Sequence, residues 1–193
     1  MGAQPGRVGP NAILQSREAL EALGGADLAV RVFEAAGLLP LHDVPPVEMV
    51  PQDKALALHR AIRAALPEDE ALWAAREGGY RTGRYILAKR IPKFAREMLQ
   101  ILPAPLAGRL LLKAIQKHAW TFAGTGRVIT APGPPMEIVI EDNPLAQPGC
   151  PWHGSVFETL FGRLVAPHVR VSHPACCATG APACRFLIDI SGA

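Results

Sequence analysis

The hydrophobic pattern of this 193-residue chain changes its period at Gly124. Before Gly124, apolar residues recur every three or four positions, as they do along one face of an α-helix. After it, the period changes to two: residues 127–131 are predicted to form a strand, and residues 136–141 alternate cleanly, with Met136, Ile138 and Ile140 on one face. Two later segments, 168–173 and 184–190, have the same character. Helices are predicted at 11–23, 27–37, 53–66, 67–78, 82–90, 92–102, 106–122 and 151–165. This order predicts an α+β fold, with several N-terminal helices packed on a roughly four-stranded antiparallel sheet.

The length predicts one domain with a modest extension. Prolines at 40, 45, 46 and 51 indicate an extended connector, so we divide the chain into a helical extension with a Pro-rich connector (1–50) and a main domain (51–193). No apolar run approaches the roughly 20 residues of a membrane span. The N-terminus has no apolar signal core, which makes a cytoplasmic protein the default expectation.

Positive charge is concentrated in one region of the chain. Residues 76–117 hold ten basic and two acidic residues, although the whole chain has a net charge of only +3. Such a region favours an anionic ligand, an acidic partner or a lipid surface, which would make the protein peripheral at the inner membrane. The alternative is a solvated helix face. No nucleic-acid motif accompanies the charge, and nucleic acid is not an expected partner. The candidate residues for carboxylates of a ligand are Arg81, Arg84, Lys89, Arg90 and Lys93.

All four cysteines lie within the last 44 residues. A helix over 151–165 is about 22 Å long, and a strand over 168–173 is about 20 Å long. If the strand runs back along the helix, His173 returns to the level of Cys150, and the next strand brings Cys184 beside it. Cys176 lies in the loop between the strands. Cys150, His173, Cys176 and Cys184 therefore form a candidate structural zinc site.

Other interpretations of the cysteines remain open at the level of sequence. They are also consistent with reduced, buried thiols, with a redox pair, or with an iron–sulfur cluster, although the tight spacing of ferredoxins is missing. Cys177 is an alternative to Cys176 as a ligand, and His153 is an alternative to His173.

The run Cys176-Cys-Ala-Thr-Gly-Ala-Pro-Ala-Cys184-Arg-Phe-Leu-Ile, with Cys150 upstream, resembles the vinyl-4-reductase domain family over residues 125–190. The resemblance implies an α+β fold with a ligand cavity between helices and sheet. Family members that sense aromatic effectors hold zinc with three cysteines and a glutamate, and His173 stands where that glutamate would be. The family name implies reduction of a vinyl group on a chlorophyll precursor, in bacteriochlorophyll biosynthesis.

The residues favour binding of a tetrapyrrole over its reduction. Gly124-Thr-Gly126 precedes a predicted strand, and Ile129 stands where a dinucleotide fingerprint needs its third glycine. We therefore expect a carrier of a magnesium porphyrin or chlorophyllide for the pathway enzymes. The alternatives are a vinyl reductase with an external electron donor, and a small-aromatic sensor or protein adaptor. His118 is the candidate axial ligand, with Trp120 and Tyr85 near the ring. The sequence does not decide between a monomer and a dimer.

Overall fold

A computed structural model describes residues 6–191 of the chain. The helices are α1 (Asn11–Ala35), α2 (Leu39–Asp43), α3 (Gln52–Ala65), α4 (Glu68–Tyr85), α5 (Lys93–Ile101), α6 (Ala104–Lys117), α7 (Trp120–Ala123) and α8 (Pro151–Leu164), with a π-helical turn η1 (Ile86–Arg90) and a 3₁₀ turn η2 (Cys177–Thr179). The strands are β1 (Arg7–Val8), β2 (Val50–Pro51), β3 (Arg127–Ala131), β4 (Met136–Glu141), β5 (Arg170–Ala175) and β6 (Ala183–Asp189). The α+β class is confirmed.

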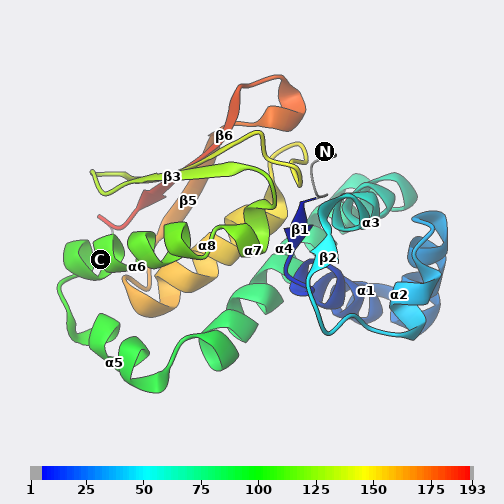
Figure 1. The fold of residues 1–193 in the computed structure, drawn as a ribbon, viewed down its shortest axis with the longest axis horizontal. Helices are drawn as coiled ribbons and strands as arrows, with labels where there is room; N and C mark the ends of the chain where they lie inside the picture. The colour runs from blue at the N-terminus through cyan, green and yellow to red at the C-terminus, as the bar shows by residue number, and fades with distance from the viewer. Residues whose placement is uncertain (1–5, 192–193) are drawn as a thin grey trace, which may run out of the picture.

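The main sheet has four antiparallel strands in the order β3-β4-β6-β5. Ile140 of β4 pairs with Cys184 of β6, and Arg127 of β3 pairs with Glu141 of β4. The register between β5 and β6 shifts between Ser172 and Ala175. Figure 1 shows the sheet along one side of the molecule, with α8 and α6 beneath it and α1–α3 at the far end. The four predicted strands are confirmed to within two residues.

Helix α8 forms the centre of the hydrophobic core. It packs on α4 on one side and approaches β5 and β6 on the other. Phe157 of α8 meets Phe186 of β6 edge to face, with ring centroids 5.1 Å apart. The inner residues of β4, Met136, Ile138 and Ile140, are buried against the helices, as their alternation predicts. The sheet therefore packs on the helices through buried side chains, and the ligand cavity that the family resemblance implies stays a prediction.

Helix α4 approaches α8 closely because glycines face it. A Cβ atom added at Gly79 would lie 2.3 Å from the carbonyl oxygen of Trp152, and one at Gly83 would lie 2.6 Å from Cβ of Thr159. Helix α4 is also longer than predicted, since the segments 67–78 and 82–90 form one continuous helix that ends in η1. Helix α1 is kinked where the sequence predicts a break, at Gly24 and Gly25, and Gly25 has φ 77°.

The N-terminal segment packs on the rest of the molecule. Val8 of β1 pairs with Val50 of β2, and the amide of Gly9 donates to the carbonyl of Thr121. Helix α1 lies along α4. The predicted boundary at residue 50 therefore falls inside a strand pair, and the domain division stays a prediction. Within residues 6–191, no helix has the length and apolar character needed to cross a bilayer.

Candidate metal centre

Four side chains from three parts of the chain converge where β5 ends and β6 begins. Cys150 precedes α8, His173 lies on β5, Cys176 follows β5, and Cys184 lies on β6. Their donor atoms all lie within 4.8 Å of one another. Cys150 adopts a left-handed backbone conformation with φ 40°, directly after Gly149 with φ 76°, and this tight turn aims its thiol at the strands. The structure therefore brings together the four residues that the sequence analysis proposes as metal ligands.

The distances between the sulfur atoms fit a tetrahedral metal. The Sγ atom of Cys150 lies 3.7 Å from that of Cys176 and 3.6 Å from that of Cys184, and the third Sγ–Sγ distance is 4.0 Å. A tetrahedral ion with metal–sulfur bonds of about 2.3 Å places its sulfur ligands about 3.8 Å apart. All four cysteines of the chain are free thiols. The cluster can therefore accept a metal without rearrangement of its sulfurs.

The histidine of the cluster supports the same interpretation. The Nε2 atom of His173 is buried and has no hydrogen-bond partner among the described residues. Its ring lies against Phe186, with centroids 4.4 Å apart, which fixes the orientation of the imidazole. A buried polar atom without a partner is costly, and His173 is one of the four residues whose donor atoms lie within 4.8 Å of one another, so a metal ligand is a fitting role for this imidazole.

A second set of groups donates hydrogen bonds to the sulfurs. The Nδ2 atom of Asn143 lies 3.4 Å from Sγ of Cys184 and 3.9 Å from Sγ of Cys150. The backbone amide of Cys177 lies 3.3 Å from Sγ of Cys184. N–H donors stabilise thiolates, and groups of this kind orient metal ligands in proteins. The sequence analysis missed Asn143, whose only signal is its place in the loop between β4 and α8.

Hydrogen bonding divides the charge unevenly within the cluster. The pKa of Cys184 is lowered, chiefly because the thiol of Cys150 donates to it, with further support from His173 and the Cys177 amide. The pKa of Cys150 is raised by the same hydrogen bond and by burial. The cluster is therefore poised to hold one thiolate and to lose further protons when a cation binds.

The two alternative ligands lie outside the cluster. The thiol of Cys177 is directed toward the carbonyl of Ile140, 3.9 Å away. The Nε2 atom of His153 lies 3.3 Å from the carbonyl oxygen of Phe122, which it can serve as a donor. Cys176 and His173 are therefore the residues that the geometry selects.

A small cavity of about 30 Å³ adjoins the cluster, between α3, α4 and the start of α8. Its wall includes His59, Arg63, Cys150, Trp152 and His153. Burial lowers the pKa of both histidines to about 4, so both are uncharged near neutral pH. The indole Nε1 of Trp152 is buried and has no hydrogen-bond partner among the described residues.

The predicted axial ligand is not placed where the sequence analysis expects it. Helix α6 ends at Lys117, and His118 is its exposed C-terminal cap with φ −105°. The side chain of His118 is therefore exposed and does not enter an apolar cavity, because the helical spacing that would align it with Leu111 and Ile115 ends at Lys117. Trp120 is 56% exposed. Neither side chain lines the cavity.

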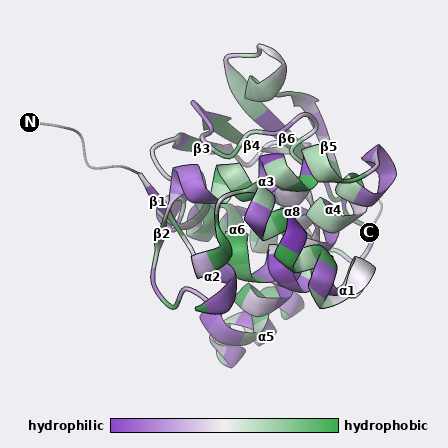
Figure 2. Ribbon diagram, turned by 90° about the vertical axis from the view of Figure 1, so that its right-hand side faces the viewer, coloured by the Kyte–Doolittle hydropathy of each residue, from purple (hydrophilic) through white to green (hydrophobic). Residues whose placement is uncertain are grey.

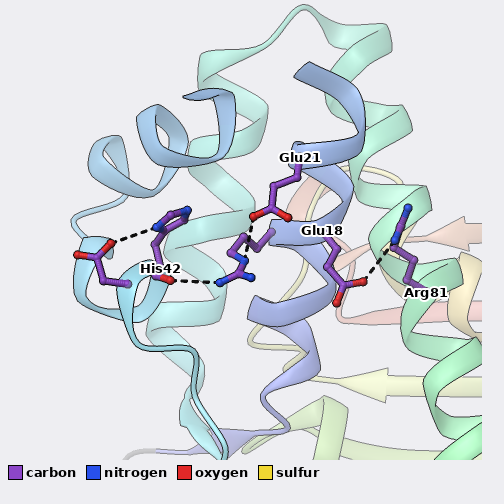
Figure 3. A network of polar contacts seen from close by, with 6 residues as sticks. Glu18, Glu21, His42 and Arg81 are labelled. Atoms are coloured by element: carbon purple, nitrogen blue, oxygen red, sulfur yellow. Dashed lines mark hydrogen bonds and ion pairs between the residues drawn. The ribbon is translucent and has the colours of Figure 1, made fainter. Parts of the chain in front are cut away.

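The predicted basic residues are spread along α4, η1 and α5. Arg81 is already paired, because it contacts Glu77 at 2.7 Å. It also contacts Glu18 of α1 at 3.3 Å, as Figure 3 shows. Lys93 pairs with Glu97 at 3.6 Å. Two aromatic contacts complete the set: Arg84 lies over the ring of Tyr80, and Arg90 lies over the ring of Tyr85. Lys89 is exposed. The structure does not gather these residues into one pocket.

Comparison with known proteins identifies relatives that match most of the chain. No family model matches the chain. The bacteriochlorophyll synthase 23 kDa chain of Cereibacter sphaeroides is 48% identical over 186 residues, which are 93% of this chain and 89% of that one. The protein of the same name from Rhodobacter capsulatus is 41% identical over 195 residues, covering 96% of this chain and 88% of that one.

Among solved structures, an H-NOX protein from S. oneidensis in the Fe(II)NO ligation state is similar in fold. It superposes with a TM-score of 0.52 and is 12% identical, over 95% of this chain and 99% of that one. At this level of identity the likeness concerns the fold alone.

Proposed function

The chain belongs to the family of the bacteriochlorophyll synthase 23 kDa chain, the bacteriochlorophyll biosynthesis J protein, and we propose that it binds a magnesium porphyrin or chlorophyllide intermediate and carries it to other enzymes of the pathway. Membership of this family gives the chain a role in bacteriochlorophyll biosynthesis. Binding and delivery of the pigment precursor is the activity that its buried groups support best.

A neutral histidine on the wall of the small cavity carries this proposal. The Nε2 atom of His59 lies 3.3 Å from the carbonyl oxygen of Ala12, to which it donates in the tautomer that carries the proton on Nε2. Because burial keeps the imidazole uncharged, Nδ1 retains a lone pair. A backbone carbonyl that holds the second nitrogen is the usual arrangement behind a metal-bound histidine. His59 is therefore a better candidate than His118 for the axial ligand of magnesium.

The cavity must widen before it can hold a macrocycle. Its volume of about 30 Å³ holds only a water-sized group, whereas sites for drug-sized ligands have several hundred Å³. Helix α4 is held against α8 at Gly79 and Gly83. Helix α3 packs mainly on α1. We therefore place the opening between α3 and the start of α8, where Arg63 can meet a ligand carboxylate.

We assign zinc to the cluster of Cys150, His173, Cys176 and Cys184, with a structural role. Three thiolates and one imidazole form a closed donor set for zinc, and zinc has no redox chemistry of its own. Cys150 belongs both to this cluster and to the cavity wall. A bound ion would therefore fix the position of the α8 N-terminus against the sheet while α3 moves.

The binding test is a spectroscopic titration of the full chain with magnesium protoporphyrin. We expect a shift and sharpening of the Soret band for the wild type, and its loss in His59→Gln. His118→Gln is the matched control, because His118 is exposed, and it should titrate like the wild type. A flat titration with the wild type would end the proposal. Conversion of a vinyl to an ethyl group, detected by mass spectrometry with an added reductant and no other enzyme, would replace the carrier by a reductase.

A further inference from the structure

Helix α5 exposes an apolar face that no other part of the described chain covers. Phe94, Met98 and Ile101 are four and three residues apart and therefore share one face of the helix. They are 71%, 44% and 83% exposed. Leu99 is the single buried residue of the helix. Helix α5 therefore leaves most of its large apolar side chains exposed, whereas a helix packed in a core would bury them.

Helix α6, which follows after a short turn at Leu102 and Pro103, also exposes apolar side chains. Leu106 and Leu110 are 45% and 36% exposed, although α6 buries its opposite face in the core. Lys113 and Lys117 follow on the same side of the helix at helical spacing. We call the set of Phe94, Met98, Ile101, Leu106, Leu110, Lys113 and Lys117 the α5–α6 surface.

The charges around this surface are almost all positive. Residues 84–117 contain one acidic residue, Glu97, and eight basic residues: Arg84, Lys89, Arg90, Lys93, Arg96, Arg109, Lys113 and Lys117. Among the described ion pairs, only that of Lys93 with Glu97 involves any of these cations. The segment that carries the exposed apolar side chains is therefore strongly cationic, and Lys113 and Lys117 are exposed on α6 itself.

The position of α5 leaves this surface free to meet a large partner. In Figures 1 and 2, α5 lies at the edge of the molecule opposite the sheet. It contacts α6 and α8 only through its inner side, where Leu99 is buried and Gln100 donates to the carbonyl of Arg163.

We propose that the α5–α6 surface docks on an anionic lipid bilayer, with α5 lying in the plane of the interface. Amphipathic helices bind this way when large apolar side chains enter the acyl region and basic residues meet the phosphates. Each basic residue near an anionic leaflet adds to the binding. This surface is separate from the small cavity, so the proposal does not depend on tetrapyrrole binding.

The same observations disfavour two other occupants. A second copy of the chain docked face to face would bring two strongly basic sets together, which is repulsive. A tetrapyrrole needs a concave site that covers most of its area, whereas the side chains of Phe94 and Ile101 are more than two-thirds exposed. A bilayer is a partner whose shape and charge both fit.

The test is co-sedimentation of the full chain with vesicles of phosphatidylcholine containing about one-third phosphatidylglycerol. We expect binding to these vesicles, little binding to pure phosphatidylcholine, and release as salt rises from about 0.1 to about 0.5 M. Phe94→Gln/Ile101→Gln should weaken binding about tenfold or more. The matched control is Val44→Gln/Val47→Gln, which removes apolar side chains that are 73% and 92% exposed elsewhere and should bind like the wild type.

A charge series tests the electrostatic part. Lys113→Gln/Lys117→Gln should weaken vesicle binding by about fivefold for each lysine removed. Arg60→Gln removes an exposed cation on α3 and should change vesicle binding by less than about twofold. Equal binding by the Phe94→Gln/Ile101→Gln variant and the wild type would overturn the proposal. The proposal would also be overturned if the Phe94→Gln/Ile101→Gln variant bound vesicles like the wild type but lost self-association or porphyrin binding. The surface would then serve another occupant.

Discussion

The Sγ atoms of Cys150 and Cys184 lie 3.6 Å apart, although 34 residues separate them in the chain. The intervening residues form α8, β5 and the η2 loop, and they return the chain to its starting level. This contact links the N-terminus of the central helix to the strand at the middle of the sheet. Replacement of one of these two sulfur atoms should therefore affect the whole C-terminal region.

Replacing Cys184 by serine should release the metal and destabilise the fold. Because a structural metal binds only the folded chain, its binding free energy adds to folding stability. We expect about one zinc per chain in the wild type and a free energy of unfolding that falls by more than about 2 kcal/mol in Cys184→Ser. Elemental analysis and denaturant unfolding measure the two effects. Cys177→Ser is the control, since Cys177 lies outside the donor cluster and should keep its metal. Full metal content in Cys184→Ser would contradict the assignment.

Asn143→Ala should weaken the metal site without removing a ligand. The side chain of Asn143 donates to Sγ of Cys184 and accepts from the amide of Leu145, so it ties the loop to the thiolate. Loss of such an outer partner usually costs 10-fold to about 100-fold in metal affinity. Competition with a zinc chelator measures the change. An affinity equal to that of the wild type would show that the backbone amide of Cys177 suffices.

The cysteine cluster could be predicted from sequence because its geometry depends on lengths alone. A helix and a strand of similar length return the chain to the same level, which places His173 and Cys184 near Cys150. The axial ligand could not be predicted in this way. His59 lies on α3, in the apolar pattern of an ordinary core helix. Its neutrality depends on burial in the folded chain, where Trp152 from a distant element is one of its neighbours. His118 was misplaced because the sequence does not show that α6 ends at Lys117.

The contact between α4 and α8 gives a test of the fold that is independent of any ligand. In Gly79→Ala the added methyl group would meet the backbone carbonyl of Trp152, which cannot move aside as a side chain can. We expect a loss of about 1–3 kcal/mol in the free energy of unfolding. Gly154→Ala on α8 is the matched control, because nothing lies within 4 Å of its added Cβ. That variant should gain up to about 1 kcal/mol from helix propensity. Equal stabilities for the two variants would mean that the helices do not touch at Gly79.

The buried His59 should make the stability of the protein depend on pH. Its pKa is lowered from 6.5 to about 4 by burial, and the carbonyl of Ala12 offsets only part of this effect. Between these two pH values the unfolded chain binds a proton at His59 and the folded chain does not. Stability is therefore complete above about pH 6.5 and falls as the pH decreases toward 4, by on the order of 3 kcal/mol for this residue.

The variant His59→Gln isolates this contribution, because glutamine has no charge at any of these pH values and can still donate to the carbonyl of Ala12. We expect a smaller loss of stability between pH 6.5 and 4 in His59→Gln than in the wild type, measured by denaturant unfolding across the range. His168→Gln removes an exposed histidine and should leave the pH dependence unchanged. The metal cluster also titrates as the pH falls, but it is the same in all three proteins, so the difference between their slopes reports His59. Identical slopes in His59→Gln and the wild type would show that His59 is accessible to protons in the folded state. An accessible imidazole of that kind would not be held neutral for an axial bond to magnesium.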